Sequence, residues 1–377
     1  MNDPLELDFS VNYKHRIYFT EGAFNVTNPI LSQLIGSSKA LVVVDVGLIT
    51  ARPALLTEIG AYALAHKLSL TRPPYILTGG EACKSDDKVV QQVLSAIEAD
   101  KICRHSYVLA IGGGAFLDAV GFAAAIAHRG VRLIRMPTTT LSQADGGVGV
   151  KNGINAFGKK NFTGTFAPPV AVVNDADFLS SLDARGRRDG LVEAVKVSIL
   201  KDADFFQSLE GQTTELAKGD KTILAKVVHR SAELHARHIA QAGDPFELGS
   251  ARPLDLGHWA AHKLEVLTAY RLSHGEAVAI GLALDIICAR EIGLFSTALT
   301  ERVLTLLEKI GFNLYADELH LDGGRPLLQG LEEFREHLGG RLTLVLPKSL
   351  GVPTQIHELD AEVIRRAADE LKTRAAR

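Results

Sequence analysis

The sequence predicts an α/β fold in which an N-terminal parallel-sheet domain precedes a mostly helical domain. The chain has 377 residues, more than one ordinary hydrophobic core holds. In its first half, short apolar runs alternate with helix-length segments, and after about Leu179 helical spacing dominates. We place the boundary near Pro168-Pro169, which gives domains at 1–168 and 169–377 with the active site between them.

The first domain contains three clear strand patterns. Residues 40–45, 107–111 and 132–137 are short apolar runs, and helix-length segments separate them. Such an order is typical of a Rossmann-like parallel sheet with crossover helices. A sheet of this kind binds its ligand at the carboxyl ends of the strands.

The second domain is predicted to consist mainly of helices. Residues 221–242 and 276–291 are long segments with helical spacing, and 361–373 resembles a closing amphipathic helix. One late strand is predicted at 342–346.

Composition narrows the possible partners and compartments. The formal charge of −3 offers no general attraction to nucleic acid or a membrane surface. The three cysteines form no CxxC pair, which argues against a disulfide framework and a thiolate zinc site. Because no signal peptide or membrane-length apolar run is present, we expect a cytoplasmic protein.

A glycine turn follows the second predicted strand. Gly112-Gly113-Gly114 precedes a helix expected to begin near Asp118, so its backbone amides could approach a pyrophosphate. A plain strand-to-helix turn is the alternative, because the pattern is not GxGxxG. Asp45 at a strand end and the polar turn containing Glu81 and Lys84 favour dinucleotide binding.

A segment rich in glycine, asparagine and lysine follows the third predicted strand. It runs from 137 to 161 and contains Lys151, Lys160 and Asn161. We expect loops here, since such a composition forms no core. Lysines on glycine-rich loops hold phosphates or polyhydroxylated anions, although a solvated basic loop has the same composition.

Three histidines and a glutamate predict a metal site. His258 and His262 are one helical turn apart, and His274 precedes an apolar helix. Glu193 supplies a carboxylate from another predicted helix. Imidazole is the commonest metal ligand, and a site with three protein ligands and an open position is typical of catalysis. The pattern therefore favours a divalent-metal enzyme over isolated core histidines.

Taken in order, these motifs resemble the sugar phosphate cyclases, the superfamily of 3-dehydroquinate synthase. The resemblance runs from about Asp45 to Pro347. It implies an enzyme that uses NAD and Zn²⁺ or Co²⁺ to turn a ketose phosphate into a carbocycle. The implied steps are transient oxidation, phosphate elimination, re-reduction and intramolecular aldol addition, with NAD regenerated at each turnover. The matching segments are 112–118, 121–125, 128–130, 137–139, 148–151, 160–161, 190–196 and those around His258 and His274.

The resemblance also implies roles for individual residues. The implied metal ligands are Glu193, His258 and His274. The implied substrate-binding and proton-handling residues are Lys151, Lys160, Asn161, Asp145, Lys196, His262, Arg252 and Asp255, together with Arg129, which would reach the phosphate in the other subunit of a homodimer. The implied NAD-site residues are Asp45, Glu81, Lys84, Gly113, Gly114, Asp118, Thr138, Thr139, Leu141, Asp145 and Lys160.

The chain departs from 3-dehydroquinate synthase where that enzyme holds its substrate carboxylate. His235 stands in place of a lysine, Arg252 is one residue closer to the Gly-His pair, and Asp255 replaces an asparagine. Losing a cation and adding an acid weakens carboxylate binding. We therefore expect a substrate that carries no carboxylate, such as sedoheptulose 7-phosphate.

The same segment points to particular branches of the superfamily. Asp255 before Gly-His and residues 334–340 resemble the 2-epi-5-epi-valiolone synthases, which usually lack a histidine at the position of His262. The run from 243 through His262 resembles the EboD-like proteins of bacterial secondary-metabolite clusters.

Three alternatives stay open. The first is authentic 3-dehydroquinate synthase. The second is a metal-dependent alcohol or glycerol dehydrogenase, against which Lys151, Lys160, Asn161 and Lys196 argue because a simple alcohol needs no phosphate-binding lysines. The third is a non-catalytic relative that only binds nucleotide, and the complete metal-ligand set disfavours it.

Overall fold

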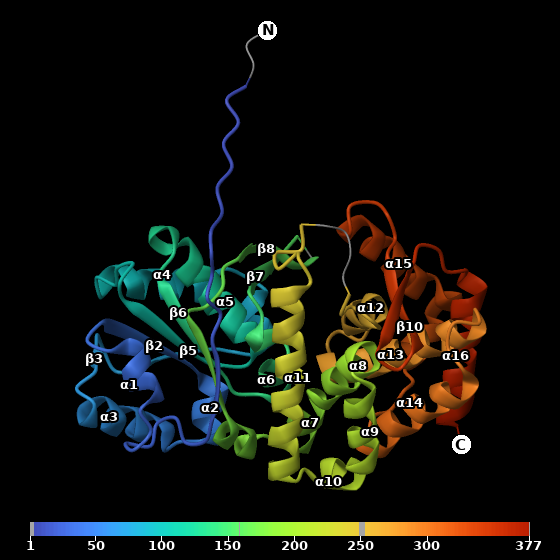
Figure 1. Ribbon diagram of the computed structural model, residues 1–377, viewed down its shortest axis with the longest axis horizontal. Helices are drawn as coiled ribbons and strands as arrows, with labels where there is room; N and C mark the ends of the chain where they lie inside the picture. The colour runs from blue at the N-terminus through green and yellow to red at the C-terminus, as the bar shows by residue number, and fades with distance from the viewer. Residues whose placement is uncertain (1–3, 158, 249–252, 377) are drawn as a thin grey trace.

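The computed structural model describes residues 4–157, 159–248 and 253–376. A sheet-containing half and a helical half lie side by side, and the long helix α11 (Lys221–Gln241) stands between them (Figure 1). The predicted α/β fold class, with a parallel-sheet half followed by a mostly helical half, is confirmed.

The N-terminal half is built on one parallel sheet of seven strands. Its order is β1-β9-β6-β5-β2-β3, and β4 also pairs with β2. Alternate side chains of β2 and β5 belong to two separate apolar clusters, so helices cover both faces of the sheet. The strands are β1 (Ile17–Thr20), β2 (Lys39–Asp45), β3 (Ser69–Leu70), β4 (Tyr75–Leu77), β5 (Tyr107–Gly112), β6 (Arg132–Pro137) and β9 (Ala171–Asp175).

Short and medium-length helices connect these strands. The helix that follows the glycine turn begins at Gly114, earlier than the predicted start near Asp118, because Gly113 already acts as its N-cap. The helices of this half are α1 (Ile30–Ile35), α2 (Val46–Ala51), α3 (Leu55–Ala65), α4 (Lys88–Ala99), α5 (Gly114–Ile126) and α6 (Thr140–Ala144).

The prediction of loops between 137 and 161 was partly wrong. Strands β7 (Lys151–Ala156) and β8 (Lys159–Phe166) form an antiparallel hairpin in which Gly153 pairs with Gly164. The two backbones approach closely there, since a Cβ on Gly153 would lie 2.6 Å from the carbonyl oxygen of Thr163. Glycine in this segment therefore permits strand pairing, which a reading based on composition misses.

The C-terminal half packs its helices around one large apolar cluster. A second hairpin, of β10 (Leu344–Ser349) and β11 (Val352–Ile356), joins this cluster. The helices besides α11 are α7 (Ala184–Asp189), α8 (Leu191–Lys201), α9 (Ala203–Gly211), α10 (Thr213–Lys218), α12 (His258–Leu267), α13 (His274–Glu291), α14 (Thr297–Ile310), α15 (Arg325–His337) and α16 (Ala361–Ala375).

Strand β9 helps to locate the boundary between the two halves. It lies after the expected boundary at 168/169, yet it pairs with both β1 and β6 of the sheet. We therefore propose that the N-terminal unit extends at least to Asp175. Among the described residues, no helix is both long and apolar enough to cross a membrane.

Candidate metal and nucleotide site

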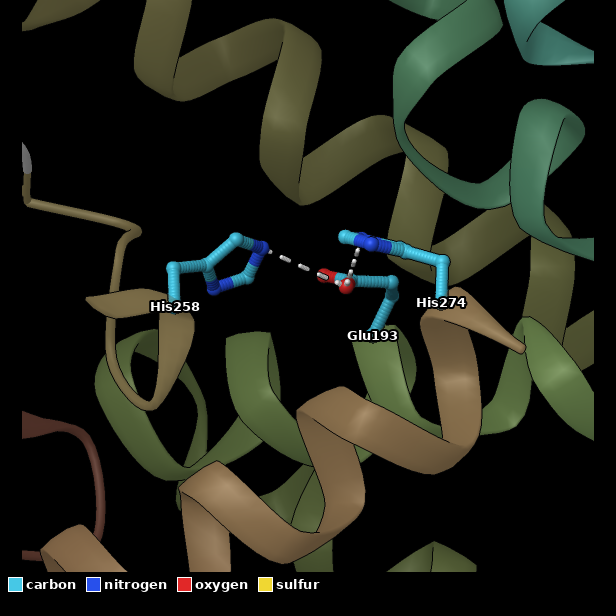
Figure 2. A group of neighbouring side chains, drawn as sticks. All are labelled: Glu193, His258 and His274. Atoms are coloured by element: carbon cyan, nitrogen blue, oxygen red, sulfur yellow. Dashed lines mark ion pairs between the residues drawn. The ribbon is translucent and has the colours of Figure 1, made fainter. Parts of the chain in front are cut away.

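Three side chains from three helices point toward one another at the centre of the predicted metal site (Figure 2). Glu193 lies on α8, while His258 and His274 are the first residues of α12 and α13. Glu193 Oε1 lies 3.7 Å from Nε2 of His258 and 4.0 Å from Nε2 of His274. The structure thus brings together the three residues that the resemblance implies as metal ligands, as a group that could hold an ion.

The chemistry of this group fits a divalent metal. The Glu193 side chain is fully buried; its Oε2 is paired with the Lys196 ammonium, whereas its Oε1 has no hydrogen-bond partner among the described residues. Burial, followed by the charge of Lys196, lowers the pKa of His258 well below its usual value. A neutral imidazole presents a lone pair, and a His₂Glu set suits Zn²⁺ or Co²⁺. These residues therefore satisfy the donor set that such a metal requires.

The start of α12 is held against α13 by close backbone packing. Gly257 has a φ of 79° and precedes His258. A Cβ on Gly281 of α13 would lie only 2.1 Å from the carbonyl oxygen of Gly257. The buried carboxylate of Asp285 accepts hydrogen bonds from the Gly257 amide (2.7 Å) and the Trp259 indole (2.9 Å). These contacts place His258 relative to the helix that carries His274.

A buried lysine connects Glu193 to a second acid. Lys196 Nζ lies 2.5 Å from Glu193 Oε2 and 3.8 Å from Asp145 Oδ2. Burial lowers the pKa of Lys196, but the two carboxylates outweigh it and raise the value overall. Asp145 Oδ1 lies 3.4 Å from Nε2 of the buried His235 on α11. Asp255 contributes to the negative potential at Lys196.

Glu265 is a buried site residue that the sequence reasoning missed. Its Oε1 lies 3.4 Å from Nδ1 of His274 and 2.8 Å from Nζ of Lys160. Burial raises the pKa of Glu265, but His274 and Lys160 outweigh it and lower the value to about 2. A signal was present in the sequence, because Glu265 follows His258 by two helical turns and therefore shares its face.

The third histidine of the pattern lies beside the metal group. The ring of His262 is 5.5 Å from that of His258 and 6.1 Å from that of His274, measured between centroids. His262 also forms a possible ligand group with Glu265 and His274.

The predicted nucleotide residues gather at the carboxyl ends of β2 and β5. The Asp45 side chain sits so close to Gly79 that a Cβ there would lie 2.1 Å from its carboxylate. A Cβ on Gly112 would lie 3.1 Å from Asp45 Cβ. Burial raises the pKa of Asp45. Gly113 begins α5, and Thr138 and Thr139 follow β6, with Thr139 capping the short helix α6 that contains Leu141.

The β7–β8 hairpin carries the remaining predicted cations and amides. Lys84 donates a hydrogen bond to Asp118 of α5 at 2.8 Å and a second one to Asn161 of β8. Lys160 lies 3.9 Å from Glu81. Lys151, by contrast, is 58% exposed and pairs with Glu247 at 2.6 Å.

Arg135 holds the segment that leads into this hairpin. It is fully buried, and its guanidinium donates to the carbonyl oxygens of Gly149 (3.2 Å) and Lys151 (2.5 Å) and to Asn152 Oδ1 (2.6 Å). The sequence reasoning also missed this residue, because an arginine inside an apolar strand shows no pattern of its own.

One predicted substrate residue lies apart from this group, and another is not described. Arg129 is exposed, with a φ of 62°, and follows His128, which has a φ of 51°. Arg252 lies outside the described residues.

Comparison with known proteins places this site in a family. Two family models match the chain in succession: the N-terminal part of 3-dehydroquinate synthase at residues 74–189 and its C-terminal part at 190–330. The chain belongs to the 3-dehydroquinate synthase family. It is therefore an enzyme of the sugar phosphate cyclase kind, as the resemblance implied.

Relatives within this family differ in activity. A 2-epi-5-epi-valiolone synthase from Streptomyces glaucescens is 34% identical over 95% of this chain and 91% of its own length. A 3-dehydroquinate synthase from Cereibacter sphaeroides is 37% identical over 78% of this chain and 80% of its own length. The solved structure of ValA, a 2-epi-5-epi-valiolone synthase from Streptomyces hygroscopicus with NAD⁺ and Zn²⁺ bound, matches with a TM-score of 0.90 and 27% identity. That match covers 98% of this chain and all of the other.

Proposed function

We propose that this enzyme is a cyclase that depends on NAD and a divalent metal. It converts sedoheptulose 7-phosphate, or a similar ketose phosphate that carries no carboxylate, into a carbocycle. The observation that carries the proposal is the group of the buried Glu193 and His258 and the half-buried His274, with Lys196 beside it. ValA, which is similar over its whole length, holds NAD⁺ and Zn²⁺ and supports the same cofactors here.

The residues of this chain divide into three tasks. Glu193, His258 and His274 would hold the metal, which when bound acts as a Lewis acid toward substrate hydroxyls. Lys196 would donate a hydrogen bond to a substrate oxygen, because its ammonium is buried next to the ligand Glu193. The residues at the ends of β2, β5 and β6 would bind NAD, including Asp45, the Gly113-Gly114 turn and the Thr138-Thr139 pair.

The substrate phosphate would be bound on the hairpin side. Lys151 has a largely exposed side chain there, and Asn161 accepts a hydrogen bond from Lys84, which also donates one to Asp118. His262 would handle a proton between these cations and the metal group. We also propose a cytoplasmic homodimer in which the exposed Arg129 reaches the phosphate of the other subunit, and a role in secondary metabolism.

The preference for an uncharged head group rests on His235. Its Nδ1 lies 3.0 Å from the carbonyl oxygen of Ser231, which only a protonated Nδ1 can satisfy, and its Nε2 faces Asp145 at 3.4 Å. The imidazole is thus held between Ser231 and an acid, at the position where 3-dehydroquinate synthases carry a lysine. Asp145 and Asp255 add negative charge nearby, which disfavours a substrate carboxylate.

The test compares phosphate release from two substrates. The pure enzyme receives NAD and Co²⁺ or Zn²⁺ with either sedoheptulose 7-phosphate or the carboxylated substrate of 3-dehydroquinate synthase. We expect phosphate from the former, far in excess of the NAD supplied, without accumulation of NADH. His235→Lys should shift the ratio of kcat/KM toward the carboxylated substrate by about tenfold to a hundredfold, the equivalent of one charge-assisted hydrogen bond.

Other outcomes would identify the alternatives. Efficient turnover of the carboxylated substrate alone would assign the chain to 3-dehydroquinate synthase, which the 37% identity to the Cereibacter sphaeroides enzyme keeps as the second candidate. NADH formed in proportion to a consumed alcohol would instead indicate a dehydrogenase.

A further inference from the structure

We propose that Glu265 is a positioning residue that joins the metal group to the β7–β8 hairpin, with its carboxylate orienting His274 on one side and holding Lys160 on the other. The inference rests on the proposed function, since it takes His274 to be a metal ligand. It adds a residue to which the sequence reasoning assigned no role.

Glu265 is deeply buried next to the metal group. It lies on α12, the helix that begins with His258, and is 1% exposed. A carboxylate buried to this extent loses its hydration, so it persists only where cations or donors replace water. The structure supplies two, at the same oxygen: Nδ1 of His274 at 3.4 Å and Nζ of Lys160 at 2.8 Å.

The contact with Glu265 decides which nitrogen of His274 carries a proton. Because Nδ1 faces the Glu265 carboxylate, the proton belongs on Nδ1. The lone pair is then on Nε2, which faces Glu193 Oε1 at 4.0 Å, within the group that would hold the metal. A carboxylate behind a ligand histidine fixes its tautomer and ring orientation, and losing such a partner typically weakens metal binding by about 10- to 100-fold.

The other partner of Glu265 is Lys160. Lys160 precedes Glu265 by 105 positions in the sequence and lies on strand β8 of the hairpin. Its side chain is mostly buried, and its ammonium also lies 5.8 Å from the Tyr270 ring centroid. Glu265 is thus the acid through which α12 holds the hairpin, so one carboxylate links the metal group to the segment that carries Asn161 and Lys151.

The test measures metal binding rather than turnover. Metal-depleted full-length protein is titrated with Co²⁺ without substrate, by calorimetry and by the visible absorption of bound Co²⁺. Glu265→Gln keeps the shape but removes the charge, and it should weaken Co²⁺ binding by about 10- to 100-fold and shift the absorption bands. The matched control is Glu333→Gln. The exposed Glu333 pairs with Lys263, which lies on α12 as Glu265 does, so this variant also removes an acid that pairs with a lysine. That variant should leave both readouts unchanged.

A second variant tests the link to the hairpin. Lys160→Met should leave Co²⁺ affinity closer to wild type than Glu265→Gln does. It should also speed chymotrypsin cleavage at the exposed Phe157 and Phe162 of the hairpin. Unchanged cleavage would overturn the hairpin part of the inference.

The outcomes separate this inference from the proposed function. If the wild-type chain binds no stoichiometric Co²⁺, the proposed metal site itself fails. If wild type binds Co²⁺ and Glu265→Gln binds it equally tightly with the same absorption bands, only the role of Glu265 is overturned. Thermal unfolding of each variant verifies that the protein remains folded.

Discussion

The metal group and the β7–β8 hairpin face each other and are built by different means. Glu193, His258 and His274 stand in the first turns of three helices, and backbone contact between α12 and α13 sets the positions of the two histidines. The hairpin contributes Lys151 and Lys160, which are held by ion pairs to acids outside it.

This contrast has a physical consequence. Helices that pack backbone against backbone have little room to move, so the two histidines proposed as metal ligands are held in place before a metal binds. Ion pairs at partly exposed positions are weak, so the hairpin depends mainly on buried contacts, which include those of Arg135 and Glu265 and the packing of Ile154 in an apolar cluster of the sheet half. We therefore expect substitutions in the metal group to have larger effects than those on the hairpin.

The largest expected effect is at His274. His274→Ala removes one of three ligands, so stoichiometric Zn²⁺ or Co²⁺ binding should be lost while the fold remains. Metal content after dialysis, together with circular dichroism, measures both. His320→Ala, which removes a histidine paired with Asp369 at another site, serves as control. Full metal content in the His274 variant would refute the ligand assignment.

The next effect concerns the contact between α12 and α13. Gly281→Ala places a methyl group 2.1 Å from the Gly257 carbonyl oxygen, so the helices must separate. We expect the free energy of unfolding to fall by about 1–3 kcal/mol or more. Gly60→Ala in α3 is the matched control, because nothing lies within 4 Å of its Cβ, and it should raise the stability by up to about 1 kcal/mol. Urea unfolding compares the two, and equal stabilities would contradict the proposed close packing.

A pH-dependent effect is expected at Asp285. Burial raises its pKa from 3.8 to about 7, so the folded state binds more protons than the unfolded state between those values. The free energy of unfolding therefore falls as pH rises from about 4 to 7, with a limiting slope of about 1.4 kcal/mol per pH unit. Asp285→Asn cannot titrate and loses one acceptor, so its deficit relative to wild type should be larger at pH 5 than at pH 8. Urea unfolding with a chelator at both pH values measures this, and a deficit independent of pH would argue against a raised pKa.

The smallest expected effect is at the exposed end of the hairpin. Glu247→Gln removes the acid that lies 2.6 Å from the largely exposed Lys151. Because water and salt screen such pairs, stability should change by less than about 1 kcal/mol. Thermal unfolding at low and high salt checks this value, and a loss as large as that of Gly281→Ala would show that the hairpin is as tightly held as the metal group.

Several features of the molecule followed from residue order alone. Apolar runs before Asp45 and Gly112 predicted strands β2 and β5 because parallel strands buried on both faces have few polar residues. The i, i+4 spacing of His258 and His262 predicted one helix face, and the motif order identified the family. Helical spacing and strand burial can be recognised directly from the order of polar and apolar residues.

Other features required the folded chain. The pairing of Gly153 with Gly164 was hidden, because a glycine-rich segment has the composition of a loop whether or not its backbone pairs. The spacing from His258 places Glu265 on the same helix face, but its partners, which lie on α13 and on β8, were hidden in the same way. A buried acid is stable only where distant residues replace its water, and no local pattern in the sequence records which residues those are.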